Sequence, residues 1–169
     1  SLPANRQTMG LFDFLGGGGG GDSALKKHAA RVANKRAQAP DRWESIHQLA
    51  KMDSVGAIEA LLVRFSYHAD PSITDAEEKD AAFEGVVAGG AKAVEPVRAF
   101  LNKSDTISWG LRMLDRLVSP AEVIGVLIET LGKMDTEYER APEKKLQLIA
   151  TLGERHDDAD RRGRHAVGR

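Results

Sequence analysis

Apolar residues recur along residues 22–153 at intervals of three and four, which is the spacing of one buried helix face. No segment shows the alternation of apolar and polar residues that is typical of a half-buried strand. The clearest helix start is the Ser-Pro-Ala-Glu sequence at residues 119–122. It combines an N-cap serine, a proline in the first turn and a glutamate spaced to bond back to the cap. The pattern therefore predicts an all-α fold.

The same signals predict where the other helices begin. A first helix is expected from Asp22 or Ser23 to Gln38. Asp41 and Glu44 have capping-box spacing and predict the start of a second helix. The apolar face of this second helix is Trp43, Ile46, Leu49 and Ala50. Further starts are predicted at Asp53, residues 74–77, Ala93, Ser104 or Asp105, and Pro142. Pro96 then falls in a first helical turn, where proline costs no hydrogen bond.

Three of these helices share one apolar pattern at regular distances along the chain. Six of their residues form a predicted buried spine: Ile58, Leu61, Val94, Val97, Ile124 and Leu127. Each helix pair occupies roughly 30 to 37 residues, which is typical of helical repeats. A pair of this length cannot bury its own apolar face, so it must stack on its neighbours. We therefore expect about three to four helix pairs, stacked as a right-handed superhelix.

These repeats resemble the HEAT/armadillo class of helical repeats. Residues 90–101 (Gly-Ala-Lys-Ala-Val-Glu-Pro-Val-Arg-Ala-Phe-Leu) are similar to the second helix of such a repeat, and residues 57–62 (Ala-Ile-Glu-Ala-Leu-Leu) are similar to its counterpart one unit earlier. Residues 158–167 are similar to the turn and helix start of the class, with Gly163 in place of an apolar residue. The resemblance implies an α-α solenoid with a concave scaffolding surface and protein partners. A few members are DNA glycosylases or bilin lyases, but no motif for those reactions occurs here.

The chain divides into three predicted parts. Residues 1–21 are expected to be a disordered segment, apolar and then glycine-rich, residues 22–153 the helical repeat domain, and residues 154–169 a polar, frayed tail. The last predicted helix carries Leu146, Ile149 and Leu152, and no second helix of its pair follows to cover them. This arrangement predicts self-association through the C-terminal edge of the array.

The composition narrows the candidate chemistry. The sequence has no cysteine and five histidines, which excludes disulfides and thiolate metal sites. No apolar run is long enough to span a bilayer, so a cytoplasmic protein is expected. The nearest acid–base pairs are His68 with Asp70 and His156 with Asp157, which we interpret as polar surface residues. No catalytic, cofactor or metal site is therefore predicted.

The formal net charge of -1 conceals an uneven distribution along the chain. Five basic residues lie within residues 22–36 and form a candidate contact for anionic lipid or an acidic partner: Lys26, Lys27, Arg31, Lys35 and Arg36. An acidic run is expected to be a solvated face: Asp70, Asp75, Glu77, Glu78, Asp80 and Glu84. The overall balance argues against a nucleic-acid partner.

Two further features are candidate contacts. Four large apolar residues before the glycine run form a candidate membrane or partner contact: Leu11, Phe12, Phe14 and Leu15. Trp109 either packs against the adjacent helix pair or anchors a partner, since aromatic residues dominate binding hot spots.

The sequence thus supports three functional hypotheses. The first is a non-enzymatic protein-interaction module or adaptor. The second is a peripheral membrane or anionic-surface tether, membrane-associated through the apolar N-terminus and the basic helix. The third is an enzyme on a helical-repeat scaffold.

Overall fold

The computed structural model describes residues 20–134 and 142–167, and over these residues the protein is helical with no strand. The apolar segment at residues 11–15 lies outside the described residues, and so does most of the predicted N-terminal part. The α-helices are α1 (Gly20–Ala33), α2 (Ala39–Lys51), α3 (Val55–Val63), α4 (Ser72–Ala88), α5 (Val94–Lys103), α6 (Ser108–Leu117), α7 (Pro120–Met134) and α8 (Pro142–Val167). Two short 3-10 helices, η2 (Arg64–Ser66) and η3 (Gly90–Ala93), follow α3 and α4.

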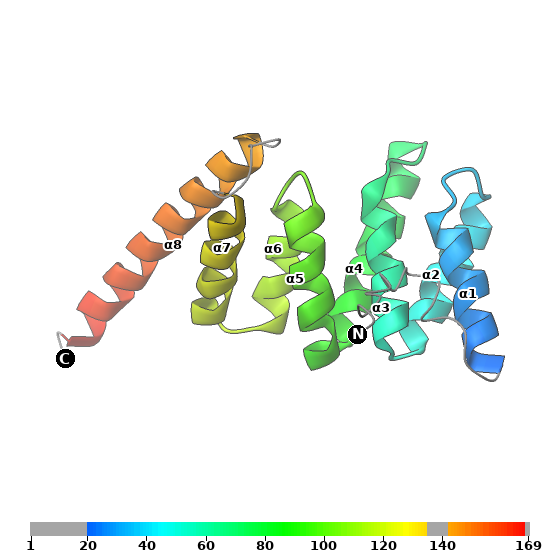
Figure 1. Cartoon of the computed structure of the whole chain (residues 1–169), viewed down its shortest axis with the longest axis horizontal. Coiled ribbons are helices and arrows are strands. Elements are labelled where there is room, and N and C mark those ends of the chain that lie inside the picture. Colours follow the sequence, from blue (N-terminus) through cyan, green and yellow to red (C-terminus); the bar gives the residue numbers. More distant parts are fainter. Residues whose placement is uncertain (1–19, 135–141, 168–169) are drawn as a thin grey trace, which may run out of the picture.

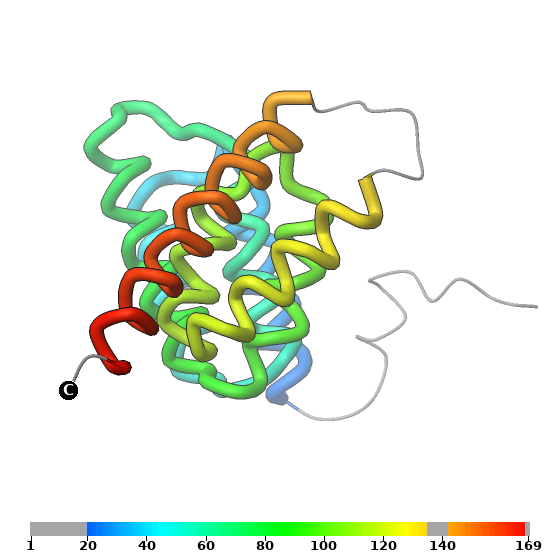
Figure 2. The backbone as a smooth tube through the Cα atoms, turned by 90° about the vertical axis from the view of Figure 1, so that its left-hand side faces the viewer, coloured from blue at the N-terminus to red at the C-terminus, as the bar shows by residue number. Residues whose placement is uncertain are grey.

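The helices follow one another along the long axis of the molecule, from α1 and α2 at one end to α8 at the other (Figure 1). Helices α1, α3, α5 and α7 contact one another in succession, and so do α2, α4 and α6. Neighbours in sequence also pack against each other, except that α4 and α5 are joined through η3, and α8 lies across the end of the array against α7 (Figure 2). The all-α prediction is therefore confirmed.

The apolar core runs continuously between these helices. Four residues of the predicted spine are buried, namely Ile58, Leu61, Val97 and Leu127, whereas Val94 and Ile124 are half-buried. On α2, Ile46 and Leu49 are buried as predicted. Trp43 was expected on the same face but is 43% exposed, because its ring turns outward against His47 with the two ring centroids 4.5 Å apart.

The strongest predicted helix start is confirmed in detail. The backbone N–H and the hydroxyl of Ser119 both donate to the Glu122 carboxylate, each at 2.9 Å, and the Ser119 hydroxyl accepts from the Glu122 backbone N–H at 3.3 Å. These bonds satisfy amide groups that a helix start otherwise leaves unpaired. Pro96 lies in the first turn of α5, as expected.

Several predicted helix bounds are wrong. Helix α1 ends at Ala33 and not at Gln38, and it begins within the glycine run at Gly20. The N-cap of α3 is Ser54, whose hydroxyl accepts from the Ala57 backbone N–H, and not Asp53, whose φ of 44° lies in the left-handed region. Helix α6 begins only at Ser108, after a loop.

The predicted capping box at residues 74–77 is also wrong. Helix α4 already begins at Ser72, with Pro71 as its N-cap residue. Thr74, the predicted cap, and Glu77 therefore both lie inside the helix. The carboxylate of Asp75, in the first turn, accepts from Arg64, Lys79 and the backbone N–H of Ala69.

The C-terminal part differs from the prediction in one respect and agrees with it in another. Residues 154–167, expected to fray, continue α8 as far as Val167. Leu146 and Ile149 are 66% and 50% exposed, as expected of an edge that no second helix covers, while the face of α8 that meets the core carries Leu148 and Lys144. The Lys144 ammonium donates to the carbonyl groups of Leu101 and Asn102 at the end of α5, which explains why a lysine occupies a buried position.

Candidate functional site

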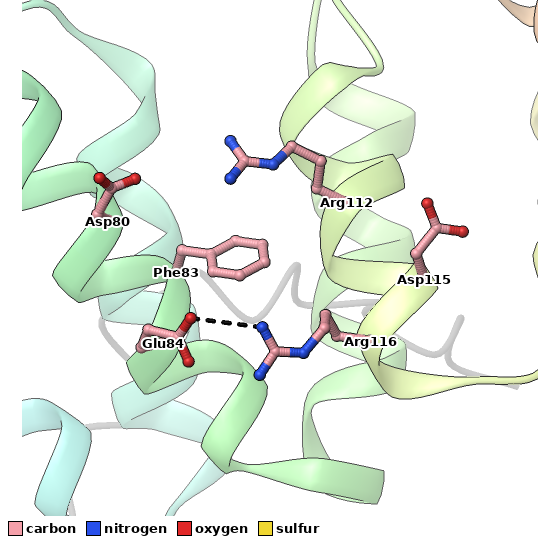
Figure 3. A pocket seen from close by; sticks show the side chains of 6 residues that line it. All are labelled: Asp80, Phe83, Glu84, Arg112, Asp115 and Arg116. Atoms are coloured by element: carbon pink, nitrogen blue, oxygen red, sulfur yellow. Dashed lines mark hydrogen bonds and ion pairs between the residues drawn. The ribbon is translucent and has the colours of Figure 1, made fainter.

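A groove of about 530 Å³ opens between α4 and α6. It is lined by side chains from both helices: Asp80, Phe83 and Glu84 from α4, and Arg112, Asp115 and Arg116 from α6 (Figure 3). These residues recur at helical spacings of three and four, so each set projects from one face of its helix. The groove is therefore a direct consequence of how α4 and α6 pack.

Aromatic rings pack against one another beside the groove. The Phe83 side chain is 6% exposed, and its ring centroid lies 6.1 Å from that of Trp109. On its other side, the Trp109 ring lies 4.9 Å from the Phe65 ring. The candidate anchor residue Trp109 is thus half-buried and packs against Phe65 of η2 and Phe83 of α4, which agrees with the packing alternative. No observation tests a role as an anchor.

The guanidinium group of Arg112 lies next to two of these rings. Its guanidinium carbon lies 4.5 Å from the Trp109 ring centroid and 5.1 Å from that of Phe83, within the range of a cation–π interaction. The side chain is exposed, and no carboxylate of residues 20–134 or 142–167 forms an ion pair with it. The aromatic contacts orient the group and leave its N–H donors free.

Most of the other charges of the groove are paired within the chain. Arg116 on α6 pairs with Glu84 on α4 at 3.4 Å, which bridges the two walls (Figure 3). Asp115 accepts two hydrogen bonds from Arg155 of α8, at 2.6 and 2.8 Å. Hydrogen bonding to Asp115 raises the pKa of Arg155. Asp80 is exposed and, in the described part of the chain, makes no ion pair.

A buried ion network fixes α4, which forms one wall of the groove. The Glu78 carboxylate accepts two hydrogen bonds of 3.0 Å from Arg42 on α2 and one of 2.7 Å from Arg64. Arg64 also donates to Asp75 at 2.8 Å. Burial alone raises the pKa of Asp75, but hydrogen bonds from Lys79, the Ala69 backbone N–H and Arg64 together lower it well below its usual range.

The sequence analysis missed this network. The acidic run was expected to be solvated, but Asp75 and Glu78 are buried because the guanidinium groups of Arg42 and Arg64 neutralise them. A signal was available, since Arg64 directly follows the apolar helix at residues 55–63. A cation within an apolar face requires a buried acid of another helix.

The predicted basic segment lies apart from the groove. Lys26 and Lys27 are exposed on α1, whereas Lys35 and Arg36 lie in the loop after it. Arg31 is half-buried and approaches Glu44 of α2 at 3.7 Å. The five residues are therefore divided between a helix and a loop.

Two of the histidines contact polar groups of the chain. His68 lies between two carboxylates, 3.4 Å from Asp70 and 3.2 Å from Asp75. His28, expected at the surface or its boundary, is 8% exposed, and its Nδ1 lies 2.9 Å from the buried Ser45 hydroxyl. Burial lowers the pKa of His28, with smaller contributions from Lys27 and Arg31.

The described residues contain neither a cluster suited to a metal ion nor a helix suited to a membrane. Across residues 20–134 and 142–167, no group of three or more acidic or histidine side chains is arranged to hold a metal ion. None of the helices in this part of the chain combines the length and the apolar character needed to cross a membrane.

Comparisons with protein-family models, with curated proteins and with solved structures find no match to this chain.

Proposed function

We propose that this protein is a non-enzymatic protein-binding module, built as a HEAT-like array of helix pairs, and that it recognises its partner in the groove between α4 and α6. The observation that carries the proposal is Arg112, an exposed cation oriented by two aromatic rings and without an acidic partner in the described chain. Arginine and aromatic residues are enriched at the energetic centres of protein interfaces.

The packing of the helices supports the same proposal. Successive contacts within two rows of helices are the arrangement expected of stacked helix pairs, which present extended surfaces for binding. The groove lies within one such row and is open to solvent, which suits a peptide segment.

A blocking experiment tests this function. Because the sequence has no cysteine, an Asp80→Cys variant of the full chain places a single thiol in the groove for modification by a bulky maleimide. Peptides are selected from a random display library against the wild-type protein. Their affinities for each variant, before and after modification, are measured by fluorescence anisotropy. We expect modification at Asp80→Cys to weaken binding at least tenfold, and the same modification at Lys26→Cys on α1 to leave it unchanged. Selected peptides that bind equally well to both modified proteins would refute the groove as the recognition site.

A peripheral membrane tether is the second candidate. It is favoured by the exposure of Lys26 and Lys27 on α1, the helix that follows the apolar residues 11–15 in the sequence. The full chain is expected to co-sediment with vesicles containing phosphatidylserine, and a Lys26→Gln, Lys27→Gln variant to do so less. Equal recovery with neutral vesicles, or with the variant, would contradict the electrostatic part of this hypothesis.

A further inference from the structure

We infer that the groove takes a peptide segment that carries one carboxylate side chain, bound by Arg112, and one basic side chain, bound by Asp80. This inference rests on the proposed function and adds the chemical class of the partner. It follows from which charges of the groove the protein leaves without an internal partner.

Arg112 is suited to a carboxylate. Its guanidinium carbon lies within cation–π distance of the Trp109 and Phe83 rings, and in the described chain none of its N–H groups donates to a carboxylate or a carbonyl group. Two parallel N–H groups of a guanidinium match the two oxygens of a carboxylate. Its neighbour Arg116 cannot serve in the same way without losing its own ion pair with Glu84.

Asp80 provides the opposite charge on the facing wall. It lies one turn before Glu84 on α4, whereas Arg112 lies on α6 (Figure 3). Neither Asp80 nor Arg112 forms an ion pair within the described residues, including with each other. A partner with one acidic and one basic side chain satisfies both walls, and because the two charges differ, it binds in one orientation only.

The surrounding charge selects against a phosphate group as the ligand of Arg112. Glu84 is paired with Arg116 and Asp115 with Arg155, so the lining charges without an ion pair in the described chain are one guanidinium group, that of Arg112, and one carboxylate, that of Asp80. A phosphate monoester carries about -1.5 to -2 charges at neutral pH, so Asp80 on the facing wall repels it more strongly than it repels a single carboxylate. The site therefore favours an acidic side chain over a phosphorylated residue or a nucleic-acid backbone.

Charge reversal tests the inference with the same peptide library. Selection against the wild-type full chain is expected to enrich peptides that share an acidic and a basic position. Selection against Arg112→Glu should replace the acidic position with lysine or arginine, and selection against Asp80→Lys should replace the basic position with aspartate or glutamate. A Lys26→Glu variant carries the same charge change on α1 and should retain the wild-type consensus. For the wild-type consensus peptide, Arg112→Gln should weaken binding at least tenfold.

The outcomes separate the two proposals. Arg112 and Asp80 are exposed, so their variants are expected to melt at the wild-type temperature, which circular dichroism checks. Peptides that are blocked by modification at Asp80→Cys but whose charged positions do not follow the reversals would overturn this inference and leave the proposed function standing. Peptides that modification in the groove does not block would overturn both.

Discussion

The buried Glu78 carboxylate provides the most demanding test of the structure. We predict that Glu78→Gln destabilises the protein strongly, because the substitution removes the charge that neutralises two buried guanidinium groups. Arg64 is 0% exposed and Arg42 is 3% exposed, so neither can reach water without moving a helix. In the wild type, Glu78 accepts three hydrogen bonds from these two residues, between 2.7 and 3.0 Å in length.

The magnitude follows from the cost of leaving a buried charge without its partner. Removing one member of a buried ion pair costs about 3–5 kcal/mol, much more than the net contribution of the intact pair. Asp75 still pairs with Arg64, so we expect a loss near the lower end, about 3 kcal/mol. For a domain of this size such a loss corresponds to a decrease of roughly 10 °C in melting temperature.

The free energy of unfolding is measured by urea titration, followed by circular dichroism at a helical band. Glu77→Gln is the matched control, since Glu77 is the adjacent residue of α4 and is exposed. The control is expected to change the free energy of unfolding by less than about 0.5 kcal/mol. A loss below about 1 kcal/mol for Glu78→Gln would show that the two guanidinium groups are solvated, and the buried network would be refuted.

Three further predictions concern the core and its helices. Leu127→Ala should lower the free energy of unfolding by about 2–5 kcal/mol, because Leu127 is fully buried. Ile128→Ala, at the next position, should lower it far less, because Ile128 is 57% exposed. Equal losses in urea titration would contradict the assigned face of α7. Gly85→Ala should destabilise the protein by about 1 kcal/mol, because the added methyl carbon would lie 3.0 Å from the Ala50 methyl carbon and 2.8 Å from a Leu61 methyl carbon. Gly125 has free space around it, so Gly125→Ala should stabilise the protein by about 0.5–1 kcal/mol. Changes of the same sign for both variants would refute the close packing of α2 and α4. Burial lowers the pKa of His28 in the folded state, so the unfolded chain binds more protons, and stability should fall as the pH decreases below about 6.5. In melting curves measured between pH 5 and 8, the melting temperature of His28→Gln should therefore change less with pH than that of the wild type. An equal dependence on pH would contradict the burial of His28.

The elements that sequence predicted well are those set by local chemistry. The cap at Ser119 needs only residues within one turn, and the apolar periodicity of α3, α5 and α7 identified most of the buried spine correctly. Long-range pairing was not accessible in the same way. The spacing of Thr74 and Glu77 satisfied the local rule for a helix start, but the helix begins at Ser72. Asp75, which was expected to be solvated, is instead engaged by Arg64 from outside the helix.

The last helix, α8, also shows what apolar periodicity leaves undetermined. Leu146, Ile149 and Leu152 have helical spacing and were predicted to form an uncovered apolar edge. Leu146 and Ile149 are exposed as expected, but the sequence did not identify Leu148 and Lys144 as the residues that meet the core. Periodicity identifies a helix and cannot choose between two faces that both carry apolar residues. The contact of the Lys144 ammonium with the end of α5 decides between them, and the exposed Leu146 and Ile149 keep self-association at this edge as a prediction.

The buried network and the groove are linked through a single helix. Glu78 is held by α2 and by Arg64 after α3, and Asp80, Phe83 and Glu84 occur within the next two turns of α4. Because an α-helix is stiff over such a distance, fixing Glu78 also fixes the direction in which these three side chains project. The opposite wall is held separately, by the ion pair of Asp115 on α6 with Arg155 on α8. Ion pairs thus hold both walls of the groove, and Arg112 and Asp80 make no ion pair within the described residues. This is the preorganisation that the proposed recognition site needs.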